Sequence, residues 1–294
     1  MNYYNEIKKE LINNENYKKV KDYSKNKHDL LTCYNVGKLL LEAGKHYGEG
    51  IIKEYSTSLT NELGKWYTPT RLKYYSRFFV DFSKSPTLSD LLTYSHYCEI
   101  IWFNENKINY YIKISIEENL SVRELRKRIK MHEYERLDEK AKERLENNNK
   151  EHIEDYIKNP ILIKTPNKNI DVSERVLKQL ILENIDSFLT ELGTGFCYIK
   201  NEYKIRIGNR YNYIDVLLFN IKFNCYVVVE LKVTELKKEH IGQIDVYMNY
   251  IDEHIKTINQ NKTIGIIICK ENNKFILKYA SDKRIFETTY LVRS

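Results

Sequence analysis

The chain has 294 residues, 42% of them apolar and 30% charged, and its net charge is +7. This balance excludes a fibrous or wholly disordered protein, and the length allows one large domain or two smaller ones. The longest aliphatic runs, such as residues 264–269, fall far short of the ~20 residues that span a bilayer, and Met1–Tyr4 leads into charged residues without the apolar core of a signal peptide. The five cysteines are scattered, with no CxxC pair. We therefore expect a cytoplasmic protein without a membrane segment and with a surface suited to a polyanion.

Residues 1–146 are predicted to form an all-helical domain. Apolar residues recur at helical spacing from Leu30 to Leu40 and from Ile51 to Leu59. Thr68-Pro69 is a strong helix start, with threonine as N-cap and proline at the first helical position. Ser121-Val122-Arg123-Glu124 fits a capping box, after which we expect a long charged helix.

The helix that begins at Thr68-Pro69 is a candidate nucleic-acid contact. Basic side chains interleaved with aromatic ones suit phosphate contact together with base or sugar packing. A helix that shows these cations on its polar face could lie in a DNA groove. The alternative is an ordinary solvated basic face. The predicted nucleic-acid-binding residues are Arg71, Lys73 and Arg77.

Turn-forming residues gather in residues 147–169, which we interpret as a linker. This segment contains Asn147–Lys150, Asn159-Pro160 and Thr165–Asn169, and half of the prolines of the chain. The second domain is then expected over residues 170–294.

The second domain changes from helical to mixed patterns. We expect a helix over Ser173–Leu192, ended by Gly193 and Gly195, and a second helix over His240–Tyr250. Strands are expected over residues 196–199, 203–207, 211–219, 224–233, 263–269 and 275–279, with a hairpin turn at Gly208-Asn209-Arg210. This order predicts a mixed sheet covered by helices, so that the whole chain is an α+β two-domain protein.

Three charged residues in apolar strands are the candidate catalytic residues. Asp215 lies inside Tyr213–Phe219, and Glu230 and Lys232 end the strand Tyr226–Lys232. A buried charge is costly unless it is paired or bound to metal. Alternation along a strand points Glu230 and Lys232 the same way, and a turn at 221–224 can return the chain beside Asp215. Such carboxylates suit Mg²⁺ or Mn²⁺, and a nearby lysine can hold water and neutralise negative charge. The alternative is a structural Glu–Lys pair at a strand end.

The same residues carry a resemblance to a known family. Asp215…Glu230-Leu231-Lys232, set among helix–strand–strand–strand–helix–strand, resembles the PD-(D/E)XK nuclease fold. The sequence resembles the bacterial YhcG-like branch of that superfamily more closely still, in five sequence blocks of the second domain and, more loosely, in the helical first domain. The blocks are Phe188–Phe196 (FLTELGTGF), Tyr213–Phe219 (YIDVLLF), Cys225–Lys232 (CYVVVELK), Gly242–Tyr247 (GQIDVY) and Ile264–Lys270 (IGIIICK).

The resemblance implies an α/β restriction-endonuclease-like core and roles for several residues. Asp215 and Glu230 would hold the metal together with the Leu231 carbonyl, Lys232 would position water, and Gln243 would face the metal site. Tyr247, four residues further along the same helix, could support Gln243 or touch the nucleic acid. Where the family often has a glutamate on the first core helix, this chain has Lys178, which leaves open Glu174, Glu183 or Glu191 as the further carboxylate.

The sequence therefore predicts a Mg²⁺- or Mn²⁺-dependent deoxyribonuclease that hydrolyses phosphodiester bonds. The resemblance implies a setting in bacterial DNA processing or in defence against foreign DNA, and cutting both strands with one site per chain suggests a homodimer. Two alternatives stay open: a nucleic-acid-binding protein with a decayed nuclease fold, and a module of a larger restriction complex that needs its partner. No small-molecule cofactor beyond the metal is expected.

Overall fold

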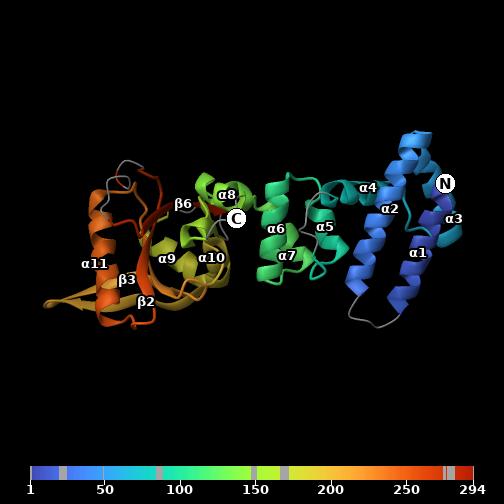
Figure 1. Cartoon of the computed structure of the whole chain (residues 1–294). Helices are drawn as coiled ribbons and strands as arrows, with labels where there is room; N and C mark the ends of the chain where they lie inside the picture. The colour runs from blue at the N-terminus through green and yellow to red at the C-terminus, as the bar shows by residue number, and fades with distance from the viewer. Residues whose placement is uncertain are drawn as a thin grey trace. The chain divides into compact units, whose positions relative to one another are not determined.

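The computed structural model divides into two compact units, Met1–Tyr134 and Glu135–Ser294 (Figure 1). It describes residues 2–19, 25–48, 50–83, 89–146, 151–165, 172–273, 276 and 282–293. No helix in these ranges is both long enough and apolar enough to cross a membrane. An all-helical unit precedes a unit with a mixed sheet, which confirms the predicted fold class.

The first unit is a set of helices packed around an aromatic-rich core. The predicted start at Thr68 is confirmed, because its hydroxyl caps the helix by accepting a hydrogen bond from the Arg71 N–H at 3.3 Å. From this helix Leu72, Tyr75 and Phe78 enter the core. The helices are α1 (Tyr3–Lys19), α2 (Lys25–Tyr47), α3 (Ile51–Leu63), α4 (Pro69–Phe82), α5 (Tyr94–Ile100), α6 (Glu105–Glu117) and α7 (Val122–Lys130).

The helix after Ser121 is shorter than the sequence pattern suggests. The capping box between Ser121 and Glu124 is present, but α7 has nine residues and its C-cap is Met131. The helix ends before His132, whose φ is +52°, and Arg128 in its last turn pairs with the buried Glu133 at 2.8 Å and with Glu118. Arg128 is therefore a buried cation of a short helix, and the long solvated helix that we expected does not form.

The second unit carries a six-stranded sheet in the order β1-β6-β5-β4-β3-β2. The pairs β2–β3 and β3–β4 are antiparallel, whereas β4–β5, β5–β6 and β1–β6 are parallel, so the sheet is mixed as predicted. Its strands are β1 (Ile161–Lys164), β2 (Phe196–Ile207), β3 (Arg210–Asn220), β4 (Cys225–Leu231), β5 (Asn261–Cys269) and β6 (Ile285–Arg293). The helices are α8 (Glu139–Glu146), α9 (Glu174–Glu183), α10 (Ile185–Leu192) and α11 (Lys238–His254), with short 3₁₀ turns at Tyr134–Arg136 and Ile153–Tyr156.

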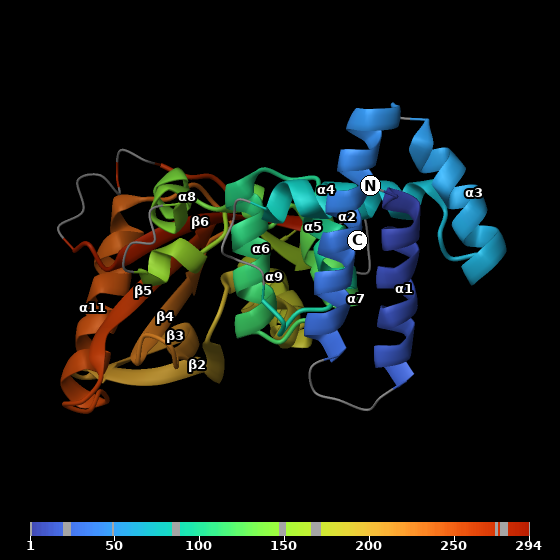
Figure 2. The same ribbon diagram turned by 45° about the vertical axis from the view of Figure 1, so that its right-hand side comes forward.

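Two apolar clusters pack against this sheet. One joins α9 and α10 to alternate residues of the central strands, including Val216 and Val229. The other joins α11 to Leu217, Val228 and their neighbours. Figure 2 shows α11 running alongside β4 and β5. The close approach of α11 depends on Gly265, because a Cβ there would come within 2.6 Å of the Met248 sulfur.

Several elements differ from the sequence-based expectation. The helix expected over 173–192 is two helices, since the backbone of Asn184 leaves the helical region. The strands expected at 196–199 and 203–207 form one strand, β2, which passes through a register shift after Tyr198 and a positive φ at Glu202. The hairpin turn at Gly208-Asn209 is confirmed. The strand expected at Phe275–Tyr279 lies outside the described residues.

The segment predicted as a linker contains part of the second unit. Residues 151–165 include a 3₁₀ turn and β1, which pairs in parallel with β6, and the division between the units lies earlier, after Tyr134. The sequence did not reveal β1, because four apolar residues between two clusters of turn residues are too few to show the alternation of a strand. Residues 147–150 and 166–169 lie outside the described residues, and the limits 146 and 170 stay a prediction.

Candidate active site

The pairing of β3 with β4 brings Asp215 and Glu230 together. The last β3–β4 pair on this side is Val216 with Val229, and Asp215 and Glu230 are the next residues along the two strands. The charge of Asp215 helps to raise the pKa of Glu230, so the two carboxyl groups lie close together. The Leu231 N–H also donates a hydrogen bond to Asp215 Oδ2 at 3.0 Å. Two acidic side chains that are 15 positions apart in the sequence therefore form one site.

Glu230 is the most deeply buried group of the site, with 2% of its surface exposed. Burial and the charge of Asp215 raise its pKa to about 8, and the charge of Lys232 opposes that shift. Lys232 Nζ lies 3.5 Å from Glu230 Oε2. The other oxygen, Oε1, is buried without a hydrogen-bond partner among the described residues. An orphaned carboxylate oxygen of this kind is costly unless a ligand completes it.

Lys178 contacts Asp215 from α9. Its Nζ lies 2.7 Å from Asp215 Oδ1 and 3.3 Å from Glu202 Oε1. Burial lowers the pKa of Lys178, but the hydrogen bonds and charges of Asp215 and Glu202 outweigh that effect and raise it. The position at which the family often has a glutamate thus supplies a cation to Asp215. Sequence reasoning noticed the substitution, but the ion pair depends on how α9 is rotated against the sheet.

Glu191 lies in a different environment from the acidic pair. It is buried, pairs with Arg136 at 2.6 Å and accepts a hydrogen bond from the Leu162 N–H at 3.2 Å. These partners tie α10 to β1, so the structure does not bring Glu191 into contact with Asp215 or Glu230. Within the described ranges, no group of three or more His, Cys, Asp and Glu residues is arranged to hold a metal ion.

Helix α11 borders the site at its first turn. The pKa of His240 is lowered, first by burial and then by the charge of Lys232. One turn further on, Gln243 Nε2 donates to the Tyr247 hydroxyl at 3.1 Å. Tyr247 is buried in the α11 cluster. Among the described residues Gln243 has no hydrogen bond to the acidic pair, so its predicted role at the metal depends on a ligand that would bridge to it.

The acidic pair fits a divalent cation. Mg²⁺ is commonly held by one or two carboxylates, and water and substrate oxygens complete its shell. Asp215 and Glu230 supply two carboxylates on adjacent strands, and the unpartnered Oε1 of Glu230 is a free ligand atom. A cation there would replace the contact of Lys178 with Asp215. The donors present therefore suit a single hard ion with an incomplete protein shell.

The three cations predicted to bind nucleic acid differ in their surroundings. Arg71 is half-buried, and its Nε donates to the Tyr75 hydroxyl at 2.9 Å. Arg77 Nε donates to Asp81 and to the Ile101 carbonyl, at 3.0 and 3.1 Å, and its guanidinium lies over the Trp102 ring. Lys73 is exposed. The side chains thus do not form one solvated stripe, and a groove contact of α4 stays a prediction.

A basic and aromatic ribbon lies next to the acidic pair, and sequence reasoning missed it. β4 pairs with β3 only from Val216 onward, so residues 203–214 of β2 and β3 continue as a two-stranded ribbon. Its register pairs Lys204 with Tyr213 and Arg206 with Tyr211, which places these four side chains on one face. All four are exposed, and Lys204 Nζ lies 3.7 Å from the centre of the Tyr211 ring. The alternation of Lys and Arg with Tyr around Gly208 was the available signal.

The mixed sheet, the acidic pair on adjacent strands and the Glu-x-Lys ending of the second strand define the PD-(D/E)XK nuclease class. Residues 154–293 match the YhcG PDDEXK nuclease domain, and residues 6–136 match the DUF1016 N-terminal domain. These two domain matches confirm the resemblance to the YhcG-like branch seen in the motifs of the chain.

Known relatives share about half of their length with this chain. The protein named "Putative nuclease YhcG" from Escherichia coli (strain K12) is 26% identical over 183 residues, which cover 60% of this chain and 49% of the relative. A repair endonuclease from Pyrococcus abyssi is 22% identical over 42% of this chain and 49% of its own, with a TM-score of 0.30. The EndoMS chain in a complex with dsDNA is 20% identical over 44% of this chain and 48% of its own, with a TM-score of 0.29.

Proposed function

We propose that the second unit hydrolyses phosphodiester bonds of DNA with the help of Mg²⁺ or Mn²⁺. The observation that carries this proposal is the convergence of Asp215 and Glu230 on paired strands, with Lys232 Nζ 3.5 Å from Glu230. The match of this unit to the YhcG PDDEXK nuclease domain supports a nuclease. The choice of DNA over RNA rests on the family resemblance.

Asp215, Glu230 and the Leu231 carbonyl would hold the ion. A bound divalent ion supplies an acidified water and neutralises charge on the phosphate. Lys232, beside Glu230, would orient the attacking water and stabilise the extra negative charge of the transition state. Gln243 and Tyr247, already joined by a hydrogen bond, would support the substrate side of the site.

The ribbon of residues 203–214 would hold the nucleic acid next to the reacting phosphate. Lys204 and Arg206 offer phosphate contacts, and Tyr211 and Tyr213 offer flat aromatic surfaces on the same face. Lys73 on α4 would add a contact from the first unit. The biological setting that we propose is DNA processing or defence against foreign DNA in the bacterial cytoplasm, with a homodimer for cuts in both strands.

The competing function is nucleic-acid binding without catalysis. The observation that favours it is the ion pair between Lys178 and Asp215, which occupies an oxygen that the metal would need. If the lysine cannot be displaced, the fold would bind nucleic acid and leave it intact.

Plasmid cleavage with Mg²⁺, Mn²⁺ or EDTA distinguishes the two functions. We expect cutting that needs the ion and that falls at least ~100-fold in Asp215→Asn, Glu230→Gln and Lys232→Met, because each removes a group that acts on the transition state. The control is Glu253→Gln, which removes an exposed carboxylate of α11. Binding by wild type without cutting in either metal would support the competing function, and equal cutting by all variants would refute the assigned site.

A further inference from the structure

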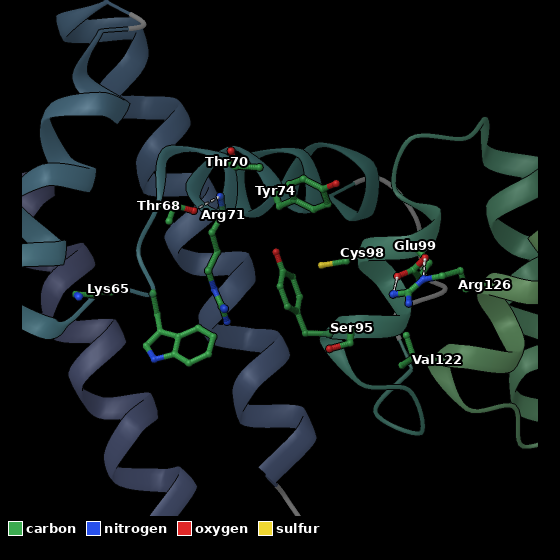
Figure 3. A pocket seen from close by; sticks show the side chains of 12 residues that line it. Lys65, Thr68, Thr70, Arg71, Tyr74, Ser95, Cys98, Glu99, Val122 and Arg126 are labelled. Carbon is green, nitrogen blue, oxygen red and sulfur yellow. Dashed lines mark hydrogen bonds and ion pairs between the residues drawn. The ribbon is translucent and has the colours of Figure 1, made fainter.

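The first unit contains a pocket that the proposed catalysis does not use. Its volume is about 660 Å³, within the range of ligand sites in proteins. It is lined by the loop before α4, by the first turns of α4 and α5, and by the start of α7. Figure 3 shows Arg71 descending from α4 toward this space, with Ser95 and Cys98 of α5 across from it.

The guanidinium of Arg71 offers unused donors to the pocket. Arg71 uses its Nε on Tyr75, whereas its two terminal nitrogens have no acceptor in the described part of the chain. A guanidinium with both terminal nitrogens open is suited to an anion.

The pocket is positively charged. Lys65 is exposed and makes no ion pair with any described residue. The first turn of α4, from Thr68 to Thr70, adds the partial positive charge of a helix N-terminus. The acidic lining residue, Glu99, is neutralised by Arg126, which donates to it twice, at 3.0 and 2.5 Å. The charge that remains favours a phosphate.

An aromatic surface accompanies this charge. Trp66 lines the pocket with 75% of its surface exposed, so most of its large apolar ring is left in contact with water, which is unfavourable. Tyr74, also in the lining, lies edge-to-face with Trp102 at 5.5 Å between ring centres. Exposed aromatic rings beside cations are the pattern on which single-stranded bases stack.

We propose that this pocket binds one unpaired nucleotide of a single-stranded nucleic acid. The phosphate lies at Arg71, Lys65 and the first turn of α4, and the base stacks on Trp66. A base inside a duplex has both faces covered by its neighbours, so only an unpaired one offers a face to Trp66. This inference deepens the proposed function, on which it rests for the nucleic-acid class of the substrate.

Tryptophan fluorescence can test the pocket directly, because the chain has two tryptophans. In the full-length Asp215→Asn, Trp102→Phe protein, Trp66 is the sole indole and no strand is cut. We titrate this protein in EDTA with a 12-nucleotide oligothymidine, a duplex of the same length and thymidine monophosphate. We expect the single strand to quench Trp66 emission at saturation and to bind at least ~10-fold more tightly than either alternative.

Variants then locate the contacts. Arg71→Met and Lys65→Met in the same background should each weaken single-strand binding about 5-fold or more, because each removes a phosphate contact. Lys38→Met, which removes an exposed lysine of α2 outside the pocket, should have no such effect. In the Trp102→Phe protein without other changes, Trp66→Ala should weaken binding measured by anisotropy of a labelled strand.

The inference is overturned if Trp66 emission does not change at saturation, if the Arg71 and Lys65 variants bind like the Lys38 variant, or if thymidine monophosphate binds as tightly as the strand. These outcomes do not depend on catalysis. If Trp66 is quenched but the protein with Asp215 intact cuts no nucleic acid, the proposed nuclease is refuted and the proposed nucleotide pocket is retained. If that protein cuts nucleic acid but Trp66 is not quenched, the pocket is refuted and the nuclease is retained.

Discussion

At the scale of single residues, the site is governed by how two carboxylates are neutralised when no metal is bound. Glu230 is buried against Lys232, and burial raises its pKa to about 8. Asp215 instead has the Lys178 ammonium 2.7 Å from its Oδ1. The two carboxyl groups therefore differ in their surroundings: Glu230 is buried with a raised pKa, and Asp215 is paired with a lysine of α9. A metal must displace that lysine from Asp215.

The raised pKa of Glu230 predicts a pH-dependent stability of the metal-free protein. Its ordinary value is 4.5 and its folded value about 8, so between these limits the folded state binds more protons than the unfolded state. The free energy of unfolding must then fall as the pH rises through this window. In urea titrations in EDTA from about pH 5 to pH 8, Glu230→Gln should lose part of this decline. Glu253→Gln should keep it, and identical slopes in all three proteins would contradict the assignment.

Lys178 is predicted to compete with the metal. Lys178→Gln leaves Asp215 without its ammonium partner and facing Glu230, so a divalent ion gains the attraction that the lysine had. We expect Mn²⁺ to bind about tenfold more tightly, which corresponds to about 1.4 kcal/mol. Isothermal titration calorimetry measures this, with Lys238→Gln on the exposed start of α11 as the control. Weaker Mn²⁺ binding in Lys178→Gln would show that the lysine supports the site instead of competing for it.

The residue scale also shows what the sequence could predict of the site. The convergence of Asp215 and Glu230 could be inferred, because each interrupts an apolar strand and a short turn joins the strands. The partners of Lys178 and Glu191 could not, since they depend on how α9 and α10 are rotated and on Arg136, 55 positions before Glu191. Spacing along one segment carries no information about such contacts.

At the scale of elements, the β2–β3 ribbon and helix α11 flank the acidic pair. The ribbon leaves the sheet where β4 ends its pairing, and α11 is pressed onto β5 at Gly265. One element is exposed and cationic, and the other is tightly packed. They are expected to respond to substitution in different ways.

The ribbon is predicted to contribute affinity and little stability. Lys204→Ala with Arg206→Ala should weaken duplex binding about tenfold, and the slope of log affinity against log salt should fall by about 2, because two phosphate contacts are lost. Fluorescence anisotropy in EDTA at several salt concentrations checks this. Lys283→Ala, which removes an exposed lysine two residues before β6, serves as the control. An unchanged salt slope would remove the ribbon from the interface.

Two glycines form a matched pair for the packing of α11. Gly265→Ala places a methyl group within 2.6 Å of Met248 and 2.8 Å of Ile244, so α11 or these side chains must move, at a cost of about 1–3 kcal/mol. Gly242→Ala, within α11 itself, meets no atom within 4 Å and should stabilise the helix by about 0.5–1 kcal/mol. Urea denaturation measures both. Equal effects of the two substitutions would mean that Gly265 is not a point of close approach.

Elements with a clear period were predictable, and those without one were not. The apolar stripe of α11 and the continuous apolar runs of β4 and β5 are visible in the sequence. β6 was missed because Glu287, Thr288 and Thr289 interrupt its apolar pattern, although Thr288 is fully buried and donates to the Lys158 carbonyl at 2.7 Å. The sequence alone does not show that such a threonine is buried, because its hydrogen-bond partner is far away in the sequence.

At the scale of the whole molecule, the chain consists of two units that each have a core of their own. The first is stabilised by aromatic packing around Phe78, which lies within 5.5 Å of Phe82, Tyr94 and Tyr97, ring centre to ring centre. The second is built on the two faces of the sheet. The two family matches, 6–136 and 154–293, follow the same division.

Independent cores predict separable unfolding. Phe78→Ala should destabilise the first unit by about 3–5 kcal/mol through the cavity it leaves, whereas Gly265→Ala should destabilise only the second. Differential scanning calorimetry of the full chain should then show one transition moved in each variant and the other unchanged. If both transitions move together in either variant, the units unfold as one cooperative body.

The pairing of Val216 with Val229 also has a consequence for how errors in the site are avoided. Both valines belong to the core cluster that packs against α9 and α10, and Asp215 and Glu230 are the next residues along the two strands. A slip of one residue between these strands would reverse the faces of one strand, so that a valine would take the place of a carboxylate and the carboxylate would enter the apolar cluster without its lysine partner. A molecule with the wrong register would thus lose core packing and the geometry of the site together. Because the core packing selects the correct register, a chain that folds stably also has its reactive groups aligned.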